Sequence, residues 1–126
     1  MFHKHLSTVK YNTAVDDTLL SEIIHPIHRK NDPQVPYSIS HAQLDPGKQS
    51  LLHKLSDSTE TYIIAAGTGE ITVGNEKEKV SKGSIIVVPP NTQQNIHNTG
   101  TTRLCFYCIV SPPWSEKLDM KVSPKE

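Results

Sequence analysis

Short runs of β-branched and aromatic residues recur along the middle of the chain, and turn residues separate them. The turns include Asp-Pro-Gly at 45–47, Gly-Thr-Gly at 67–69 and Pro-Pro-Asn at 89–91. Such punctuation is typical of short strands joined by tight turns, and the Gly-Thr-Gly segment is predicted to be a hairpin turn. Eight strands at this spacing predict an all-β antiparallel sandwich or barrel. The eight runs cover residues 38–44, 51–56, 60–66, 70–73, 77–80, 84–88, 93–98 and 102–110.

One of these runs also fits a helix. Asp57 and Glu60 have the spacing of a capping box that could open a helix through Ala66. The β-branched Ile63 and Ile64 favour a strand instead.

The two ends of the chain carry weaker patterns. Residues 19–24 suit a strand or a helical turn, and the prolines that follow predict an irregular arm. The last stretch begins with Pro112-Pro113 and ends in charged residues, which indicates a tail with one helical turn at most. Trp114 is predicted to plug one end of the barrel or to pack on a subunit partner. The expected division is an N-terminal arm at 1–37, a barrel core at 38–110 and a C-terminal tail at 111–126.

Length and charge narrow the classes of protein that the chain can represent. Its 126 residues suffice for one domain, and 13 basic residues balance 13 acidic ones. Since binders of nucleic acid or anionic membranes carry a basic excess, neither partner is expected. No apolar run approaches the roughly 20 residues of a membrane-spanning helix. The polar N-terminus lacks the apolar stretch of a secretory signal, so we expect a cytoplasmic protein.

The chain contains two cysteines, Cys105 and Cys108. In a reducing cytosol, two cysteines favour free thiols over a disulfide framework. Alternation along the run at 104–110 would point them to opposite faces of a strand, away from any shared ion. We therefore assign both a structural role.

Two spaced motifs stand in the middle of the chain. In the first, Gly47 is followed after five residues by His53-Lys54-Leu55, after four more by Glu60, and after six more by Gly67. The second consists of Gly83, Pro89, Asn91, Gln94 and Asn98. Both resemble the two motifs of the cupin superfamily, over roughly residues 38–110. The resemblance implies an antiparallel double-stranded β-helix, that is, a jelly-roll or cupin barrel with an N-terminal arm.

The chain departs from the metal-binding members of that superfamily at two positions. In those members two histidines and a glutamate of the first motif, with a histidine of the second, converge on one divalent ion. The matching positions here are His53, Leu55, Glu60 and Gln94. Leu55 has no donor atom, and Gln94 offers a weaker amide oxygen. The resemblance thus implies a metal set of His53, Glu60 and Gln94, which suits iron, manganese, nickel or zinc but holds them less tightly.

Side-chain alternation predicts the same cluster from the residues alone. Glu60 and Tyr62 share one strand face, as do His53 and Leu55 on another. Faces that mix polar and apolar residues in this way are typical of a ligand pocket, with Leu55, Tyr62, Phe106 and Cys108 as candidate walls. The alternative is that Glu60 lies in solvent at a strand end and Gln94 satisfies a turn.

The remaining histidines are expected outside this pocket. His25 and His28 flank Pro26 in the arm and are predicted to be surface residues unless a strand of the arm crosses into the site. His41 lies three positions before Leu44, so the two side chains point to opposite faces of the strand. If Leu44 packs inward, His41 is expected to point outward. His97 has opposite parity to Gln94 and is expected on the exterior or at an interface.

Three functions fit these features. The first is a metal-dependent enzyme acting on a small oxygenated metabolite. The second is a metal-free module that binds a small sugar-like or carboxylated molecule. The third is a metal-free isomerase or epimerase with an acid–base histidine. It is ranked last because it needs a second acid or base inside and a basic residue for a sugar phosphate, while the arginines are Arg29 and Arg103, and Arg103 precedes the last strand. Apolar residues on both strand faces, such as Ile63 opposite Tyr62, predict a homodimer.

Overall fold

The computed structural model describes residues 1–123, so the last three residues of the predicted tail lie outside the described part of the chain. Strands account for most of the regular structure, with two single-turn 3₁₀ helices. The helices are η1 (Leu6–Thr8) and η2 (Glu116–Leu118). The strands are β1 (Asn12–Thr13), β2 (Leu19–Ile24), β3 (Ser38–Leu44), β4 (His53–Leu55), β5 (Thr59–Ala66), β6 (Thr68–Val73), β7 (Glu76–Ser81), β8 (Ile85–Val88), β9 (Gln94–Asn98), β10 (Leu104–Ser111) and β11 (Asp119–Lys121).

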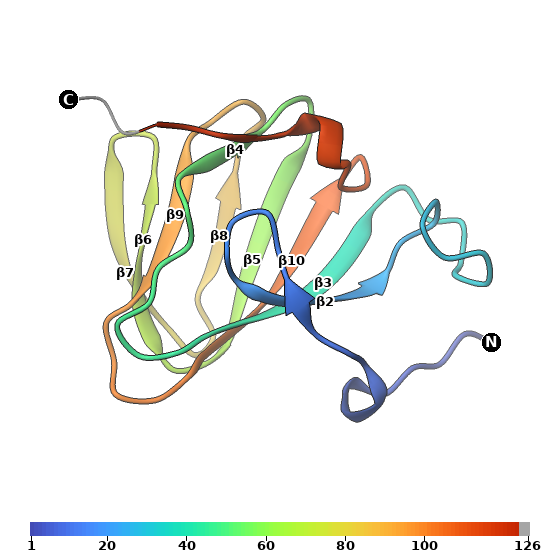
Figure 1. The fold of residues 1–126 in the computed structure, drawn as a ribbon, viewed down its shortest axis with the longest axis horizontal. Helices are drawn as coiled ribbons and strands as arrows, with labels where there is room; N and C mark the ends of the chain where they lie inside the picture. Colours follow the sequence, from blue (N-terminus) through green and yellow to red (C-terminus); the bar gives the residue numbers. More distant parts are fainter. Residues whose placement is uncertain (124–126) are drawn as a thin grey trace.

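The strands form two antiparallel sheets that face one another (Figure 1). One sheet has the order β1-β2-β3-β10-β5-β8, and the other has the order β11-β4-β9-β6-β7. Strands that are neighbours in sequence often lie in different sheets, as in a double-stranded β-helix. The predicted all-β jelly roll is therefore confirmed.

All eight predicted strands are present, and the helical alternative at 57–66 is wrong. Asp57 has a φ of 65°, in the left-handed region, and lies in the turn before β5. Along β5 buried and partly exposed residues alternate, with Glu60, Tyr62 and Ile64 buried. This period of two matches a strand whose one face packs into the barrel.

The prediction of a hairpin at Gly67-Thr68-Gly69 is also wrong. β5 belongs to the six-stranded sheet and β6 to the five-stranded one, so the chain crosses between sheets at Gly67. Gly67 has a φ of +85°, and a Cβ there would lie 2.7 Å from the carbonyl oxygen of Arg103. The glycine is required because the crossing chain passes against the backbone that leads into β10.

The space between the sheets is filled by apolar side chains from the inward faces of both. Alternate residues of β10 are buried, and β5, β6 and β9 contribute in the same way. The cluster consists of Ala42, Leu44, Tyr62, Ile64, Ile71, Val80, Val88, Ile96, Leu104, Phe106 and Cys108. This core fills the space between the two sheets except at one end of the barrel, where other residues line a cavity.

Both ends of the chain add strands to the barrel. β2 pairs with β3, so the arm extends the six-stranded sheet. β11 pairs with β4, and Figure 1 shows the C-terminal segment running beside that strand. The sheets thus extend beyond the predicted core at 38–110. Within residues 1–123, the structure contains no helix that is long and apolar enough to cross a membrane.

Candidate functional site

A cavity of about 250 Å³ lies where the arm, the tail and the two sheets meet. Its walls come from the β1–β2 loop, β2, β3, β4, β5, β10 and the segment around η2. The apolar walls include Leu20, Ile39, Leu55, Val110 and Trp114. The polar walls include Asp16, Glu22, Ser38, Ser40, His53, Glu60, Glu116 and Asp119.

The structure brings three of the predicted site residues to this cavity. His53 and Leu55 reach it from β4, and Glu60 reaches it from β5. His53 is 3% exposed and Glu60 is 7% exposed, so the alternative of a solvent-exposed Glu60 is wrong. Trp114 also lines the cavity, in keeping with the predicted plug.

Four other predicted residues are not among the lining residues. Tyr62, Phe106 and Cys108, expected as walls, belong to the packed core. Gln94 is 1% exposed, and its amide oxygen accepts a hydrogen bond from the hydroxyl of Tyr62. These side chains do face the barrel interior, as their alternation along the strands predicted. Core side chains pack against them, however, and the cavity lies closer to the arm.

His53 is held between two carboxylates that the sequence analysis did not single out. Its Nδ1 donates to Asp119 Oδ1 at 3.0 Å, and its Nε2 lies 3.5 Å from Asp16 Oδ2 without a hydrogen-bond partner. Burial by itself would lower the pKa of His53. The hydrogen bond to Asp119 and the charges of Asp16 and Asp119 outweigh it, so the pKa of His53 is raised.

Each carboxylate is itself held in place. The Trp114 indole Nε1 donates to Asp119 Oδ2 at 2.8 Å. Asp16 Oδ1 accepts from the backbone and the hydroxyl of Thr18, at 3.1 and 2.7 Å. Since Asp16 lies in the arm and Asp119 in the tail, neither belongs to a motif, and no local signal marks them.

Glu60 is buried beside this group. Its Oε1 has no hydrogen-bond partner. Burial raises the pKa of Glu60 to about 7, against the charge of His53, which lowers it. Hydrogen bonds from Cys108 and Gln94 also lower the pKa, and the charge of Asp16 raises it. Glu60 therefore exists in both protonation states near neutral pH.

The residues present do not fit the metal set implied by the resemblance. Leu55 supplies no donor, Gln94 is engaged by Tyr62, and Nδ1 of His53 is engaged by Asp119. Over residues 1–123, one group of three His, Cys, Asp or Glu side chains has donor atoms within 4.8 Å of one another, and it does not include His53 or Glu60. That group is Glu22, His25 and His28.

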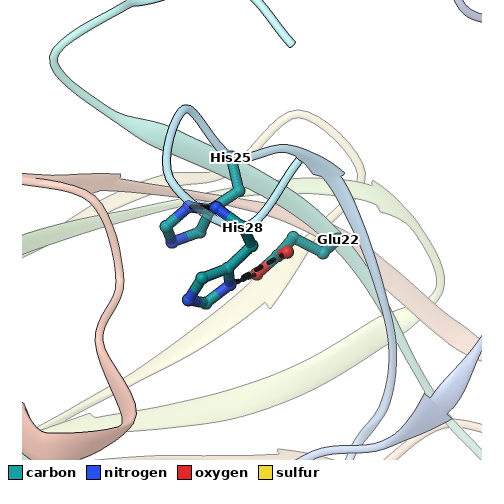
Figure 2. Close-up of side chains that lie close together, drawn as sticks. All are labelled: Glu22, His25 and His28. Atoms are coloured by element: carbon teal, nitrogen blue, oxygen red, sulfur yellow. Dashed lines mark hydrogen bonds and ion pairs between the residues drawn. The ribbon is translucent and has the colours of Figure 1, made fainter. Parts of the chain in front are cut away.

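Figure 2 shows that group, where the rings of His25 and His28 stack with centroids 3.5 Å apart. A surface position was predicted for both histidines unless a strand of the arm reached the site. β2 does line the cavity, and His25 is fully buried whereas His28 is exposed. The Nε2 of His25 donates to the Trp114 carbonyl at 2.7 Å, and its Nδ1 accepts from the backbone N–H groups of Ile27 and His28. With both nitrogens engaged, His25 fastens the arm to the tail and has none left for an ion.

His41 differs from its prediction in burial. It lies on the outer face of β3, as expected, yet it is 4% exposed because the arm covers it. The Tyr11 hydroxyl donates to His41 Nδ1 at 2.7 Å, and Tyr107 packs edge-on against the ring. His97 is half-buried on β9, and both cysteines are free thiols, Cys108 buried and Cys105 half-buried. The predicted free thiols are confirmed.

Two facing antiparallel sheets with a histidine and a carboxylate in one internal cavity define a small double-stranded β-helix protein. The chain belongs to the Cupin domain family (Cupin_2), whose sequence profile matches residues 40–110. It is 37% identical over 109 residues to an uncharacterized protein of Methanocaldococcus jannaschii, covering 86% of this chain and 85% of that one.

Solved structures share the fold at lower identity. A predicted oxalate decarboxylase of Thermotoga maritima has a TM-score of 0.76 at 18% identity, covering 88% of this chain and 99% of that one. A nucleoside dehydratase of Streptomyces has a TM-score of 0.75 at 15% identity, covering 100% and 94%. At such identities the likeness establishes the fold alone.

Proposed function

We propose that the chain binds a small oxygenated metabolite in the barrel cavity and catalyses proton transfer on it, with His53 and Glu60 as the acid–base pair. The observation that carries this proposal is the arrangement of His53, whose Nδ1 is fixed by Asp119 while its buried Nε2 lies at the cavity without a hydrogen-bond partner, 3.5 Å from Asp16 Oδ2. A histidine oriented by a carboxylate in this way is equipped to act as a general base.

The proposed roles follow from the hydrogen bonds. Because the Asp119 carboxylate can only accept, Nδ1 of the neutral ring carries the proton and Nε2 offers a lone pair. Nε2 takes a proton from a C–H or O–H group of the substrate, and Asp119 and Asp16 stabilise the imidazolium that forms. Protonated Glu60 then donates its proton to the oxygen that gains electrons or leaves. Elimination of water, isomerisation and epimerisation all follow this pattern.

The comparisons are compatible with this reading. The Streptomyces neighbour, described as a nucleoside dehydratase, has a barrel of the same fold. Dehydration consists of removing a proton and protonating a departing hydroxyl, and it needs one base and one acid. The metal-free acid–base enzyme, ranked last on sequence grounds, is our first choice because of the way Asp119 holds His53 at the cavity.

A divalent-metal protein remains the second candidate. It is favoured by two of the three buried side-chain atoms that lack a hydrogen-bond partner in residues 1–123, namely Nε2 of His53 and Oε1 of Glu60. Zinc, iron, manganese or nickel could bind there only if both atoms, together with the Gln94 amide oxygen that now accepts from Tyr62, turned toward one ion. Because a metal-free pocket and a metal site predict different responses to chelation, one experiment separates them.

That experiment measures hydrogen–deuterium exchange at substrate carbon atoms in D₂O. Panels of small hydroxylated aldehydes, ketones and acids are incubated with protein treated with EDTA, and exchange is followed by proton NMR. The proposal expects exchange of at least one compound, lost by about 100-fold or more in His53→Gln and kept in the control His97→Gln, whose histidine lies on β9 outside the cavity lining. Exchange that disappears on chelation and returns with metal supports the second candidate instead. Exchange that His53→Gln leaves intact overturns the proposal. We also propose that the protein is cytoplasmic, as predicted from its polar N-terminus.

A further inference from the structure

The walls of the cavity carry more acidic than basic side chains. Five carboxylate residues line it: Asp16, Glu22, Glu60, Glu116 and Asp119. Among the described residues, His53 is the one basic side chain in the lining, and neither a lysine nor an arginine contributes to it. A chain with zero net charge thus contains a strongly acidic internal surface.

Within residues 1–123, no lysine or arginine forms an ion pair with these carboxylates. Asp16 and Asp119 are within ion-pair distance of His53, and Glu22 accepts from His28 Nδ1 at 3.0 Å. The other contacts found for Asp16 and Asp119 come from Thr18 and Trp114, which are neutral. Even with His53 charged, the lining keeps an excess of negative charge at neutral pH.

A second observation, independent of the charge count, points to a ligand. Glu60 is 93% buried, and its Oε1 has no hydrogen-bond partner in the described part of the chain. A buried carboxyl oxygen without a donor is costly, and a donor supplied by a bound molecule would relieve that cost. Trp114 adds an aromatic wall, a surface on which cations bind favourably.

We infer that the ligand of this cavity is a small organic cation, a hydroxylated molecule that carries a protonated amine. A hydroxyl of the ligand donates to Glu60 Oε1, and the ammonium group is attracted by the other carboxylates of the lining. Phosphorylated and carboxylated metabolites are rejected, because they would enter an acidic space without a lysine or arginine to bind them. The inference rests on the proposed function, since it concerns the same cavity, and it disfavours the carboxylated ligand considered from the sequence.

The test compares three probes that differ in charge and share a six-carbon polyol chain: glucamine, sorbitol and gluconate. Each is titrated into ¹⁵N-labelled protein with EDTA present, and amide shifts of cavity residues such as Ile39 and Val15 are followed by NMR. Glucamine should bind at least about tenfold more tightly than sorbitol, and gluconate should leave the cavity signals unchanged. Raising the salt to about 0.5 M should weaken glucamine binding several-fold.

Variants then locate the binding. Glu22→Gln and Glu116→Gln each remove one lining charge near the rim and should weaken glucamine binding about three- to tenfold. The control Glu78→Gln, on the exposed strand β7, should have no effect. Two rim variants are used so that a folding defect in one does not decide the result.

The titrations and the exchange assay together distinguish four outcomes. Sorbitol or gluconate binding as tightly as glucamine overturns the inference and leaves the proposed function standing. Glucamine binding that both rim variants leave unchanged also overturns the inference, because the amine then binds elsewhere. No cavity shift from any probe up to about 50 mM rejects both the inference and the small-molecule cavity. Glucamine binding with no His53-dependent exchange of any compound supports the charge preference and rejects the acid–base role.

Discussion

Replacing Glu60 with glutamine should stabilise the protein at alkaline pH and leave it nearly unchanged at acidic pH. In the folded chain burial raises the pKa of Glu60 from 4.5 to about 7. The native state therefore keeps this proton over a pH range in which the unfolded chain has already released it. Stability contributed by the protonated, buried carboxyl is complete below about pH 4.5 and is lost as the pH rises through 7.

The size of the effect follows from that difference in pKa. About 2.5 pH units at 1.36 kcal/mol each correspond to about 3 kcal/mol of unfolding free energy. Glutamine has nearly the same shape and does not ionise, so Glu60→Gln removes the pH-dependent term. The variant should match the parent within about 1 kcal/mol at pH 5 and exceed it by about 3 kcal/mol at pH 8.5.

Urea denaturation followed by the fluorescence of Trp114 measures this difference at a series of pH values. Glu78→Gln, on the exposed strand β7, is the matched control and should follow the parent at every pH. A free-energy difference between Glu60→Gln and the parent that stays constant with pH, or that shrinks as the pH rises, would refute the burial of an ionisable carboxyl at this position.

Three further predictions concern the same cavity and the outer surface. Asp119→Asn should lower the pKa of His53, since the carboxylate hydrogen bond that raises it is lost; an NMR titration of the imidazole that finds no decrease would contradict the pairing. Leu55→His places a buried donor beside His53 and should cost about 1–3 kcal/mol without metal, with zinc restoring part of the loss. Calorimetric titration of this variant and the parent with zinc, nickel and manganese checks it, and tight binding by the parent would favour a metal protein. The homodimer predicted from the sequence should use β8, an edge strand on which Ile85 and Val87 are 67% and 58% exposed. Light scattering should give about twice 14.0 kDa for the parent and the monomer mass for the double variant Ile85→Lys/Val87→Lys. A parent mass near 14 kDa at micromolar concentration would reject the dimer.

The eight central strands and the barrel architecture were predictable from the amino-acid sequence. Alternating burial and turn residues are local properties, so the eight central strands could be read from short windows, and two spaced motifs were enough to indicate the barrel. The same local parity placed His53, Leu55 and Glu60 on inward faces. Because facing strands of one barrel share an interior, their meeting in one cavity followed from the pattern.

The groups that surround those residues depend on segments far away in the chain. Asp119 lies 66 positions from His53 in the chain and reaches it only because β11 pairs with β4. Asp16 comes from the opposite end, on a loop of the arm. Neither pairing has a local signal, because hydrogen bonds between distant strands depend on the completed sheets.

Burial, too, was set by distant segments. His25 became a buried link between arm and tail, and His41 was covered by Tyr11, although their own neighbours in sequence suggested exposure. Gln94 lies on the inward face of β9, as predicted, but it accepts a hydrogen bond from Tyr62, because the core is packed around it and no cavity is open there. Strand faces are local, whereas desolvation and hydrogen-bond partners depend on what the rest of the chain packs against them, and here those decide the chemistry of the cavity.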